Sequence, residues 1–440
     1  MMIDTSYKQY TLDNGLIVAL KKIRCKTILS TLRIWQGPID EKSGETGLVH
    51  LLEHNISRGG KGTNTKETLN KLGVFGEFYG YTFIDRTVYS IGVMPRDLEI
   101  ALEYMSTSAF NPALNPKLFE VEKNIILREI ADSIAEKPHS PTTTFTKEYF
   151  GEEHIKLLKR IMDSQYETTI KNATIDSLKE VYRRGYAPNN SDIVIVGELP
   201  ENIEDIVQKN FGGYQKKECI KTPVPNMDPK GIKIVHIQHP ELYYPEDPKA
   251  SSLKLTLGIP MTKYHEEDYF SAFALSQLIG NGFSSRILDT IRHENGLVYN
   301  LQSRYVTEQN SSRMEIIGKI PSGKHNEIIG MIFDEFNTLQ TTLISPEEAE
   351  KFFRKREYNL TRGYNYPEHI TNHIESNIEY NTTTDNDLER LKRVTPQSIM
   401  NAARKYLPRS QQEGNYVLLM RDPLKDIIDL DKEQPMEFIW

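Results

Sequence analysis

The segment His50-Leu51-Leu52-Glu53-His54 places two histidines around a glutamate, in a chain with only 11 histidines among 440 residues. If the segment is helical, the three polar side chains share one face, because residues three and four positions apart are neighbours on a helix. Two imidazoles are suitable zinc ligands, and a carboxylate beside them can accept a proton from water. A solvated helix face with two surface histidines is the alternative interpretation.

A third zinc ligand would have to come from another element. Asn115 and Pro116 have the residue types of an N-cap and a first helical position, so the segment 115–136 is predicted to be one long helix. Glu122 and Glu129 are separated by two helical turns and therefore share a face. Either could reach a metal on a neighbouring helix; taken alone, both are ordinary solvated acids.

The elements that position these helices follow from periodicity and turn residues. A hairpin is predicted within residues 1–22, with Asp13-Asn14-Gly15 as its turn. The other expected elements are strands at 27–36, 80–94 and 251–260 and helices at 45–58, 95–110 and 266–278. Residues 213–231 contain three prolines and no periodicity, which indicates a linker between domains 1–212 and 232–440. A helix-turn-strand order at 174–200 recurs at 395–423, which favours a duplication, although this order is common.

The two helical motifs together resemble the inverted zincins (peptidase family M16), the group of pitrilysin, insulin-degrading enzyme and the mitochondrial processing peptidase β-subunit. His50-Leu51-Leu52-Glu53-His54 has the HxxEH order, the reverse of HExxH, and 122-EKNIILRE-129 matches the E-x6-E pair of that family. The resemblance implies a metalloendopeptidase with one Zn²⁺ per chain. It assigns His50, His54 and Glu129 as ligands, Glu53 as general base and Glu122 as an acid that helps order the site.

The likeness extends over nearly the whole chain. It implies an α+β fold of the short two-domain form, with two similar domains that each hold a mainly antiparallel sheet flanked by helices. The segment 183–199 is similar to the family's Tyr-x-Pro-x-Asn turn and the strand after it. The segment 280–299 resembles a glycine-rich turn and helix of the family's second domain, where Arg292 and Tyr299 match a pair that holds the scissile carbonyl and the peptide backbone. A surface arginine and a core tyrosine are the plain alternative.

One stretch departs from the family pattern. The strand beside the zinc usually carries Asn-Ala-x-Thr, whereas this chain has Tyr79, Gly80, Tyr81 and Thr82. Thr82 is kept, and Tyr79 and Gly80 replace the usual Asn and Ala. The stretch is still expected to bind a substrate peptide through main-chain pairing, but a cleavage preference cannot be carried over from relatives.

Composition restricts the partners and the compartment. Hydrophobic residues make up 38% and charged residues 26%, the formal net charge is −7, and no long basic block is present. We therefore predict a soluble globular protein without a nucleic-acid partner or a membrane span. The 2 distant cysteines and the absence of a visible signal segment favour a cytoplasmic location.

Family members of this length pair as dimers that enclose a chamber. We therefore expect a homodimer, or a heterodimer with a related chain, that cleaves flexible peptides or leader and presequence segments. Two alternatives stay open: a catalytic subunit that needs a dissimilar partner, and a non-catalytic scaffold subunit, against which the retained motif positions argue. His369 and His373 are also four apart but have no glutamate between them and are expected to lie on an exposed helix; no role is predicted for the segment 421–440.

Overall fold

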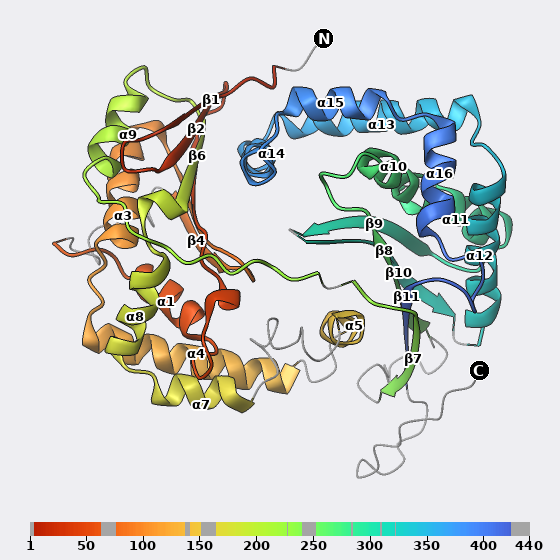
Figure 1. Cartoon of the computed structure of the whole chain (residues 1–440), viewed down its shortest axis with the longest axis horizontal. Helices are drawn as coiled ribbons and strands as arrows, with labels where there is room; N and C mark the ends of the chain where they lie inside the picture. Colours follow the sequence, from red (N-terminus) through yellow and green to blue (C-terminus); the bar gives the residue numbers. More distant parts are fainter. Residues whose placement is uncertain are drawn as a thin grey trace. The chain divides into compact units, whose positions relative to one another are not determined.

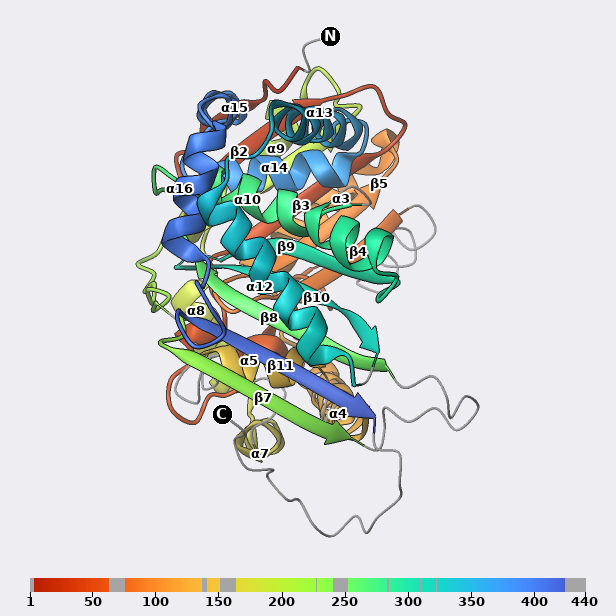
Figure 2. The same ribbon diagram turned by 90° about the vertical axis from the view of Figure 1, so that its right-hand side faces the viewer.

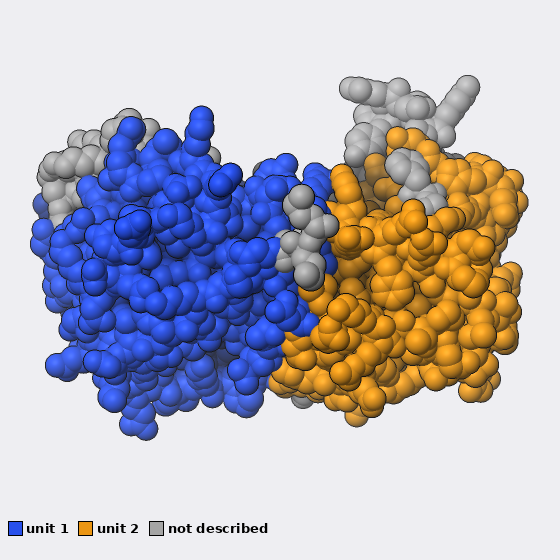
Figure 3. Space-filling model, turned by 90° about the horizontal axis from the view of Figure 1, so that it is seen from above, with its two compact units in different colours: residues 1–138, 156–224, 359–385 blue, residues 139–155, 225–358, 386–440 orange. Residues whose placement is uncertain are grey.

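The computed structural model describes residues 4–62, 76–136, 141–150, 164–226, 228–239, 252–282, 285–308, 310–321 and 323–423 (Figure 1). The chain forms two compact units, which Figure 3 distinguishes by colour. Unit 1 consists of Met1–Pro138, Lys156–Val224 and Asn359–Asp385, and unit 2 of His139–Ile155, Pro225–Tyr358 and Asn386–Trp440. Each unit has its own sheet and its own hydrophobic core. None of the described helices has the length and hydropathy needed to cross a bilayer.

The sheet of unit 1 has the strand order β1-β2-β6-β3-β5-β4. Its strands are β1 (Lys8–Thr11), β2 (Ile17–Lys22), β3 (Ile28–Ile34), β4 (Gly76–Thr82), β5 (Thr87–Val93) and β6 (Ser191–Gly197). Only the β2–β6 pair is parallel. The hairpin predicted around Asp13-Asn14-Gly15 is confirmed by the pairing of β1 with β2. The single extended segment predicted at 80–94 is wrong: the Phe83 N–H donates to the Arg86 carbonyl at 2.7 Å, and this turn separates β4 from β5.

Helices pack on both faces of this sheet (Figure 1). They are α1 (Leu48–Ile56), α3 (Leu98–Phe110), α4 (Pro116–Glu136), α7 (Ser164–Asn172), α8 (Ile175–Gly185), α9 (Ile203–Phe211) and α14 (Pro367–Glu379), with short 3-10 turns at Pro38–Asp40, Pro95–Asp97 and Pro188–Asn190. Ile193 and Ile195 of β6 belong to the main core, whereas Val194 and Val196 pack with Ile370 of α14. Because strand side chains alternate between faces, the apolar run at 193–196 in β6 is buried on both sides of the sheet.

Unit 2 has the strand order β7-β11-β8-β10-β9, and Figure 2 shows α10, α12 and α16 over one face of this sheet. Its strands are β7 (Ile232–His239), β8 (Ser252–Met261), β9 (Asn300–Glu308), β10 (Ser311–Pro321) and β11 (Tyr416–Pro423). Its helices are α5 (Pro141–Phe150), α10 (Tyr269–Gly280), α11 (Arg286–Leu288) with a π-helical turn at Asp289–Glu294, α12 (His325–Thr341) and α16 (Pro396–Tyr406). Two further helices, α13 (Pro346–Gly363) and α15 (Thr384–Lys392), have residues in both units.

The two sheets repeat one topology. Strands β2, β6, β3, β5 and β4 occupy the same successive places as β7, β11, β8, β10 and β9, and β7–β11 is again the parallel pair. Helices α8 and α16 also begin alike: the N–H of Ser177 or Ser398 donates to the hydroxyl of Thr174 or Thr395 at 3.1 Å. The predicted α+β fold with two similar, mainly antiparallel domains is therefore confirmed.

The compact units are not contiguous halves of the chain. The boundary at Val224–Pro225 lies inside the predicted linker 213–231, but 139–155 belongs to unit 2 and 359–385 to unit 1, unlike the predicted domains 1–212 and 232–440. Packing explains both exchanges. Ile370 of α14 packs on β6, and a Cβ at Gly258 of β8 would lie 2.3 Å from Phe145 of α5. Residues 283–284 and 424–440, parts of two segments singled out above, lie outside the described residues.

Candidate metal centre

Helix α1 begins at a position that its neighbours determine. Gly47, its N-cap, has a φ of 90°, and a Cβ there would lie 1.8 Å from the Tyr166 ring. A glycine N-cap has no side chain with which to cap the helix, and the Glu41 carboxylate does so instead. It accepts the N–H of Gly47 at 3.0 Å and that of Val49 at 2.8 Å. The first turn of α1 is therefore held by a carboxylate in a position that the helix dipole favours.

The motif histidines lie side by side on α1, with ring centroids 4.8 Å apart. Each Nδ1 is already engaged. His50 Nδ1 lies 2.8 Å from the Tyr166 hydroxyl, and His54 Nδ1 lies 2.9 Å from Glu122 Oε2. This arrangement leaves the Nε2 atom of each ring to act as a ligand, with the ring orientation fixed from behind.

Helix α4 places both predicted glutamates, Glu122 and Glu129, next to the two histidines. Its predicted start is confirmed, since the Asn115 side chain accepts the Lys117 N–H at 2.9 Å. Glu129 faces both rings: its Oε2 lies 3.9 Å from His50 Nε2 and its Oε1 lies 3.8 Å from His54 Nε2. Glu122 is only 2% exposed. It lies behind His54 and also pairs with Arg58.

Glu53 lies between α1 and the edge strand β4. It is 6% exposed, its Oε2 accepts a hydrogen bond from the Thr82 hydroxyl at 3.0 Å, and the same oxygen lies 3.9 Å from His50 Nε2. A Cβ at Gly80 would lie 2.3 Å from Glu53 Oε1. The unusual Gly80 therefore makes room for the Glu53 carboxylate. Alternation along the strand directs Tyr79 and Tyr81 to the opposite face of the sheet.

The carboxylates set the charge of this cluster. Burial opposes a proton on His54, but the hydrogen bond with Glu122 and the charges of Glu53 and Glu129 outweigh burial and raise the pKa of His54 above its usual value. Burial also opposes the charge of Glu122, yet hydrogen bonds from His54 and Arg58 hold the pKa of Glu122 below its usual value. The surroundings thus favour a cation next to the imidazoles.

This donor set fits a zinc ion. The ligand atoms of His50, Glu53 and His54 lie within 4.8 Å of one another, and Glu129 approaches both rings as described. Zinc ligands bound at about 2.0–2.1 Å in a tetrahedron lie roughly 3.3 Å apart, so the 3.8–3.9 Å separations from Glu129 need only small side-chain shifts. Neutral imidazoles and a carboxylate are ligand types that zinc accepts.

The other predicted residues lie elsewhere. In unit 2 the Arg292 guanidinium lies 5.1 Å from the centre of the Tyr299 ring, so the structure brings this pair together, and Tyr299 is 84% exposed. His369 and His373 lie on α14, where their rings contact Tyr366 and Tyr364.

Sequence reasoning missed three residues of the centre: Tyr166, Glu41 and Arg58. Tyr166 is 116 positions from His50 and reaches it only because α7 packs beside α1 and α4. No spacing rule connects residues that far apart. Glu41 had a weak signal, since an acid shortly before a helix that begins with glycine is a plausible cap. Arg58 lies four residues after His54, just past the end of α1, and its short distance in sequence from the motif could have linked it to the cluster.

Comparison with known proteins places the chain in a family. The model for insulinase (peptidase family M16) matches residues 17–158, and the model described as peptidase M16 inactive domain matches residues 172–352. Among proteins similar in sequence is the "uncharacterized zinc protease YmxG" of Bacillus subtilis (strain 168). It is 22% identical over 356 residues, which are 78% of this chain and 81% of that protein.

Solved structures show the same fold. A protease from Helicobacter pylori has a TM-score of 0.76 at 18% identity, and the match covers 95% of this chain and 100% of that one. The periplasmic protease PqqL from Escherichia coli has a TM-score of 0.76 at 18% identity, and the match covers 97% of this chain but 48% of that one. The two family models, the relatives named zinc protease and the shared fold agree with one another, and the chain belongs to the M16 peptidase family.

Proposed function

We propose that this chain is a zinc-dependent endopeptidase that hydrolyses peptide bonds in flexible peptides. One Zn²⁺ per chain would be held by His50, His54 and Glu129. The observation that carries the proposal is the convergence of α1 and α4: the two oxygens of Glu129 face the two Nε2 atoms at 3.9 and 3.8 Å, while both Nδ1 atoms are engaged from behind. The names of the relatives, zinc proteases, support the same assignment.

Two carboxylates compete for the role of third ligand. Glu53 approaches His50 Nε2 at 3.9 Å through an oxygen that Thr82 already binds. Glu129 addresses both rings, one oxygen to each. We therefore assign Glu129 as the ligand and leave Glu53 beside the centre, where a base is needed.

When bound there, zinc supplies a Lewis acid that lowers the pKa of water toward about 7 and polarises a carbonyl. Glu53 then acts as the general base: its carboxylate accepts a proton from the attacking water and returns it to the leaving amine. The Thr82 hydroxyl orients Glu53 Oε2. Glu122 fixes His54 and keeps its own charge through Arg58.

Substrate positioning would involve both units. The main chain of β4, the last strand of its sheet, is suited to pair with an extended peptide next to Glu53. Arg292 and Tyr299 of unit 2 supply a guanidinium and a phenol, which are suitable donors to a developing oxyanion. Among the described residues, the grouping of metal-ligand side chains is found in unit 1. This chain carries both the metal-ligand residues and the Arg292/Tyr299 pair, so a homodimer would need no dissimilar partner. We include this homodimer in the proposal.

The experiment is cleavage of a mixed peptide library by the purified chain, with zinc content measured in parallel and Glu53→Gln as the control. We expect cleavage by the wild-type chain, and no cleavage by Glu53→Gln although it keeps its zinc. A chain that binds zinc but cleaves nothing would contradict the self-sufficient homodimer and favour a chain that needs a dissimilar partner, or a scaffold. A chain that binds no zinc would overturn the metal assignment.

A further inference from the structure

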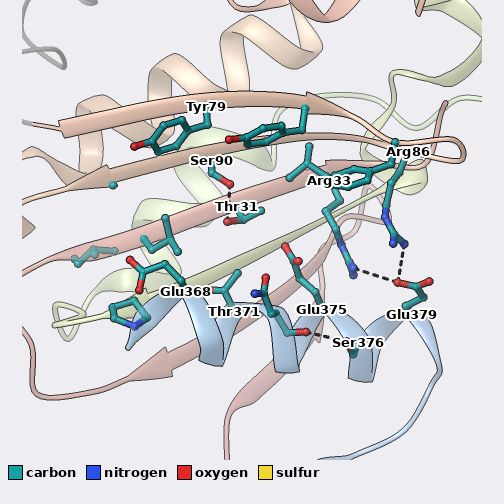
Figure 4. A pocket seen from close by; sticks show the side chains of 18 of the residues that line it. Thr31, Arg33, Tyr79, Arg86, Ser90, Glu368, Thr371, Glu375, Ser376 and Glu379 are labelled. Carbon is teal, nitrogen blue, oxygen red and sulfur yellow. Dashed lines mark hydrogen bonds and ion pairs between the residues drawn. The ribbon is translucent and has the colours of Figure 1, made fainter. Parts of the chain in front are cut away.

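A groove of about 910 Å³ lies within unit 1, between the sheet and α14 (Figure 4). Strands β3, β4 and β5 form its floor and α14 forms the facing wall. It lies on the face of the sheet opposite the metal centre, because Gly80 and Thr82 of β4 face Glu53 whereas Tyr79 and Tyr81 line the groove. The edge strand thus separates the metal centre from the groove.

One side of the groove is aromatic. Tyr79, Tyr81 and Phe83 follow one another along the same face of the strand, with ring centroids 6.4 and 6.5 Å apart. They are also among the most exposed large hydrophobic side chains, at 43%, 55% and 50%. Exposed aromatic rings in a row offer faces on which an apolar or cationic group can lie.

The facing wall is acidic. The groove-lining side chains of α14 recur at helical spacing and include Glu368, Thr371, Glu375 and Glu379. Glu379 is used internally, since the Arg86 guanidinium donates to it at 2.6 Å. Arg33 in the floor is likewise compensated, because its Nε donates to buried Asp192 at 2.8 Å. With both guanidiniums balanced, Glu368 and Glu375 are the further carboxyl groups on the wall that faces the groove.

Three buried polar atoms of the groove have no hydrogen-bond partner among the described residues: Arg33 Nη2, Thr371 Oγ1 and Glu375 Oε1. Arg33 and Thr371 are each only 2% exposed. Figure 4 shows Arg33, Thr371 and Glu375 directed into the same space from two elements. Buried polar groups without partners are costly, so Thr371 Oγ1 and Glu375 Oε1, which can both accept a hydrogen bond, point to a ligand that donates to them.

We propose that this groove is a subsite for the basic side chain, arginine or lysine, of a peptide that lies along the groove. A guanidinium or ammonium would donate to Glu375 Oε1 and Thr371 Oγ1 and lie against the Tyr81 ring. The inference rests on the proposed function in that the bound peptide is the substrate; the binding itself requires no cleavage.

The electrostatics of Glu375 agree with this ligand. Burial raises the pKa of Glu375 to about 7, with Arg33 and Arg86 opposing the shift and Asp192 and Glu379 adding to it. A cation next to Glu375 favours its ionised form. Binding of a basic side chain near neutral pH should therefore release a proton.

The test is isothermal titration of the full chain carrying Glu53→Gln, which prevents turnover, with two peptides that differ only in one arginine or citrulline. Citrulline keeps the shape of arginine and removes its charge. We expect the arginine peptide to bind at least roughly tenfold more tightly, the size of one charge-assisted hydrogen bond. Titration in two buffers of different ionisation enthalpy should also show proton release for the arginine peptide alone. The pH range for this is about 6–7, from about one unit below the Glu375 pKa up to that pKa.

Variants locate the effect. Adding Glu375→Gln should remove both the preference and the proton release, and Tyr81→Leu should weaken the arginine peptide while keeping the proton release. The control Glu201→Gln removes an exposed carboxylate of unit 1 outside the groove and should keep both effects. If Glu375→Gln fails to fold, Thr371→Val, which removes only a buried hydroxyl, should reduce the preference in its place.

Two results would overturn the subsite: equal binding of both peptides by the folded chain, or a preference that survives in Glu375→Gln and Thr371→Val. Neither depends on catalysis. A wild-type chain that cleaves nothing but discriminates arginine from citrulline would sink the proposed peptidase and keep the subsite. A chain that cleaves peptides without discrimination would do the reverse.

Discussion

The two histidines of the candidate metal centre are held by different partners. His54 Nδ1 meets the charged Glu122, whereas His50 Nδ1 meets the neutral Tyr166 hydroxyl at 2.8 Å. Tyr166 is 4% exposed and its ring also covers Gly47 at the start of α1. The hydroxyl therefore fixes which nitrogen of His50 faces the ligand side, and it does so without adding charge.

Removing that hydroxyl should weaken zinc binding. Loss of such a partner behind a metal ligand typically costs about 10–100-fold in affinity, so Tyr166→Phe should raise the zinc dissociation constant by roughly tenfold or more. Competition with a chromophoric chelator measures it. Tyr10→Phe is the matched control, because it removes a buried hydroxyl that has no hydrogen-bond partner among the described residues. Unchanged zinc affinity in Tyr166→Phe would show that α1 packing alone orients His50.

Glu375 should make stability depend on pH. Its pKa is raised from 4.5 to about 7 by burial, so the folded chain keeps a proton that the unfolded chain gives up between these values. Stability is then lost as pH rises through this window, by up to about 3 kcal/mol above it. Glu375→Gln should unfold at higher urea than wild type at pH 8 and at equal urea at pH 4.5 (about the unfolded pKa). An equal difference at both pH values would contradict the assignment; Glu201→Gln is the control.

At the scale of the element, α1 depends on a cap from outside the helix. Glu41 accepts the N–H groups of Gly47 and Val49, so Glu41→Ala should cost about 1 kcal/mol of stability, the usual value of an N-terminal cap. Zinc affinity should fall as well, because the first turn leads directly into His50. Glu41→Gln keeps one acceptor oxygen and should lose less of both. Denaturant titration of the apo and zinc-loaded chains separates the two effects, and a fully stable Glu41→Ala would contradict the cap.

Elements with local signals could be predicted from the sequence. Asp13-Asn14-Gly15 has the residue types of a hairpin turn, and Asn115-Pro116 has those of a helix start. The structure has the hairpin β1–β2 and the helix α4 at these places. The break between β4 and β5 was missed because Phe83–Arg86 contains neither glycine nor proline. Tyr166 and the groove under α14 depend on packing between elements far apart in the chain. No local pattern reports such contacts, whereas the HxxEH spacing is itself local.

At the scale of the whole molecule, one topology is used twice with different chemistry. Helix α10 follows β8 as α1 follows β3, yet its sequence YFSAFALSQLIG contains no histidine and no acidic residue. Unit 2 thus repeats the scaffold of unit 1 without its metal motif, while it carries Arg292 and Tyr299. A duplicated fold can divide labour in this way, with one unit supplying the metal site and the other supplying donors to the substrate.

This division can be tested by separating zinc binding from turnover. Tyr299→Phe keeps the ring that lies 5.1 Å from the Arg292 guanidinium and removes only the hydroxyl. If that hydroxyl stabilises the oxyanion, kcat should fall roughly 10²–10³-fold, the usual cost of one such donor, while zinc content stays unchanged. Tyr358→Phe, at another exposed tyrosine of unit 2, should keep full activity. Full activity in Tyr299→Phe would leave unit 2 with a structural role, and a loss of zinc would show that the two units are not independent.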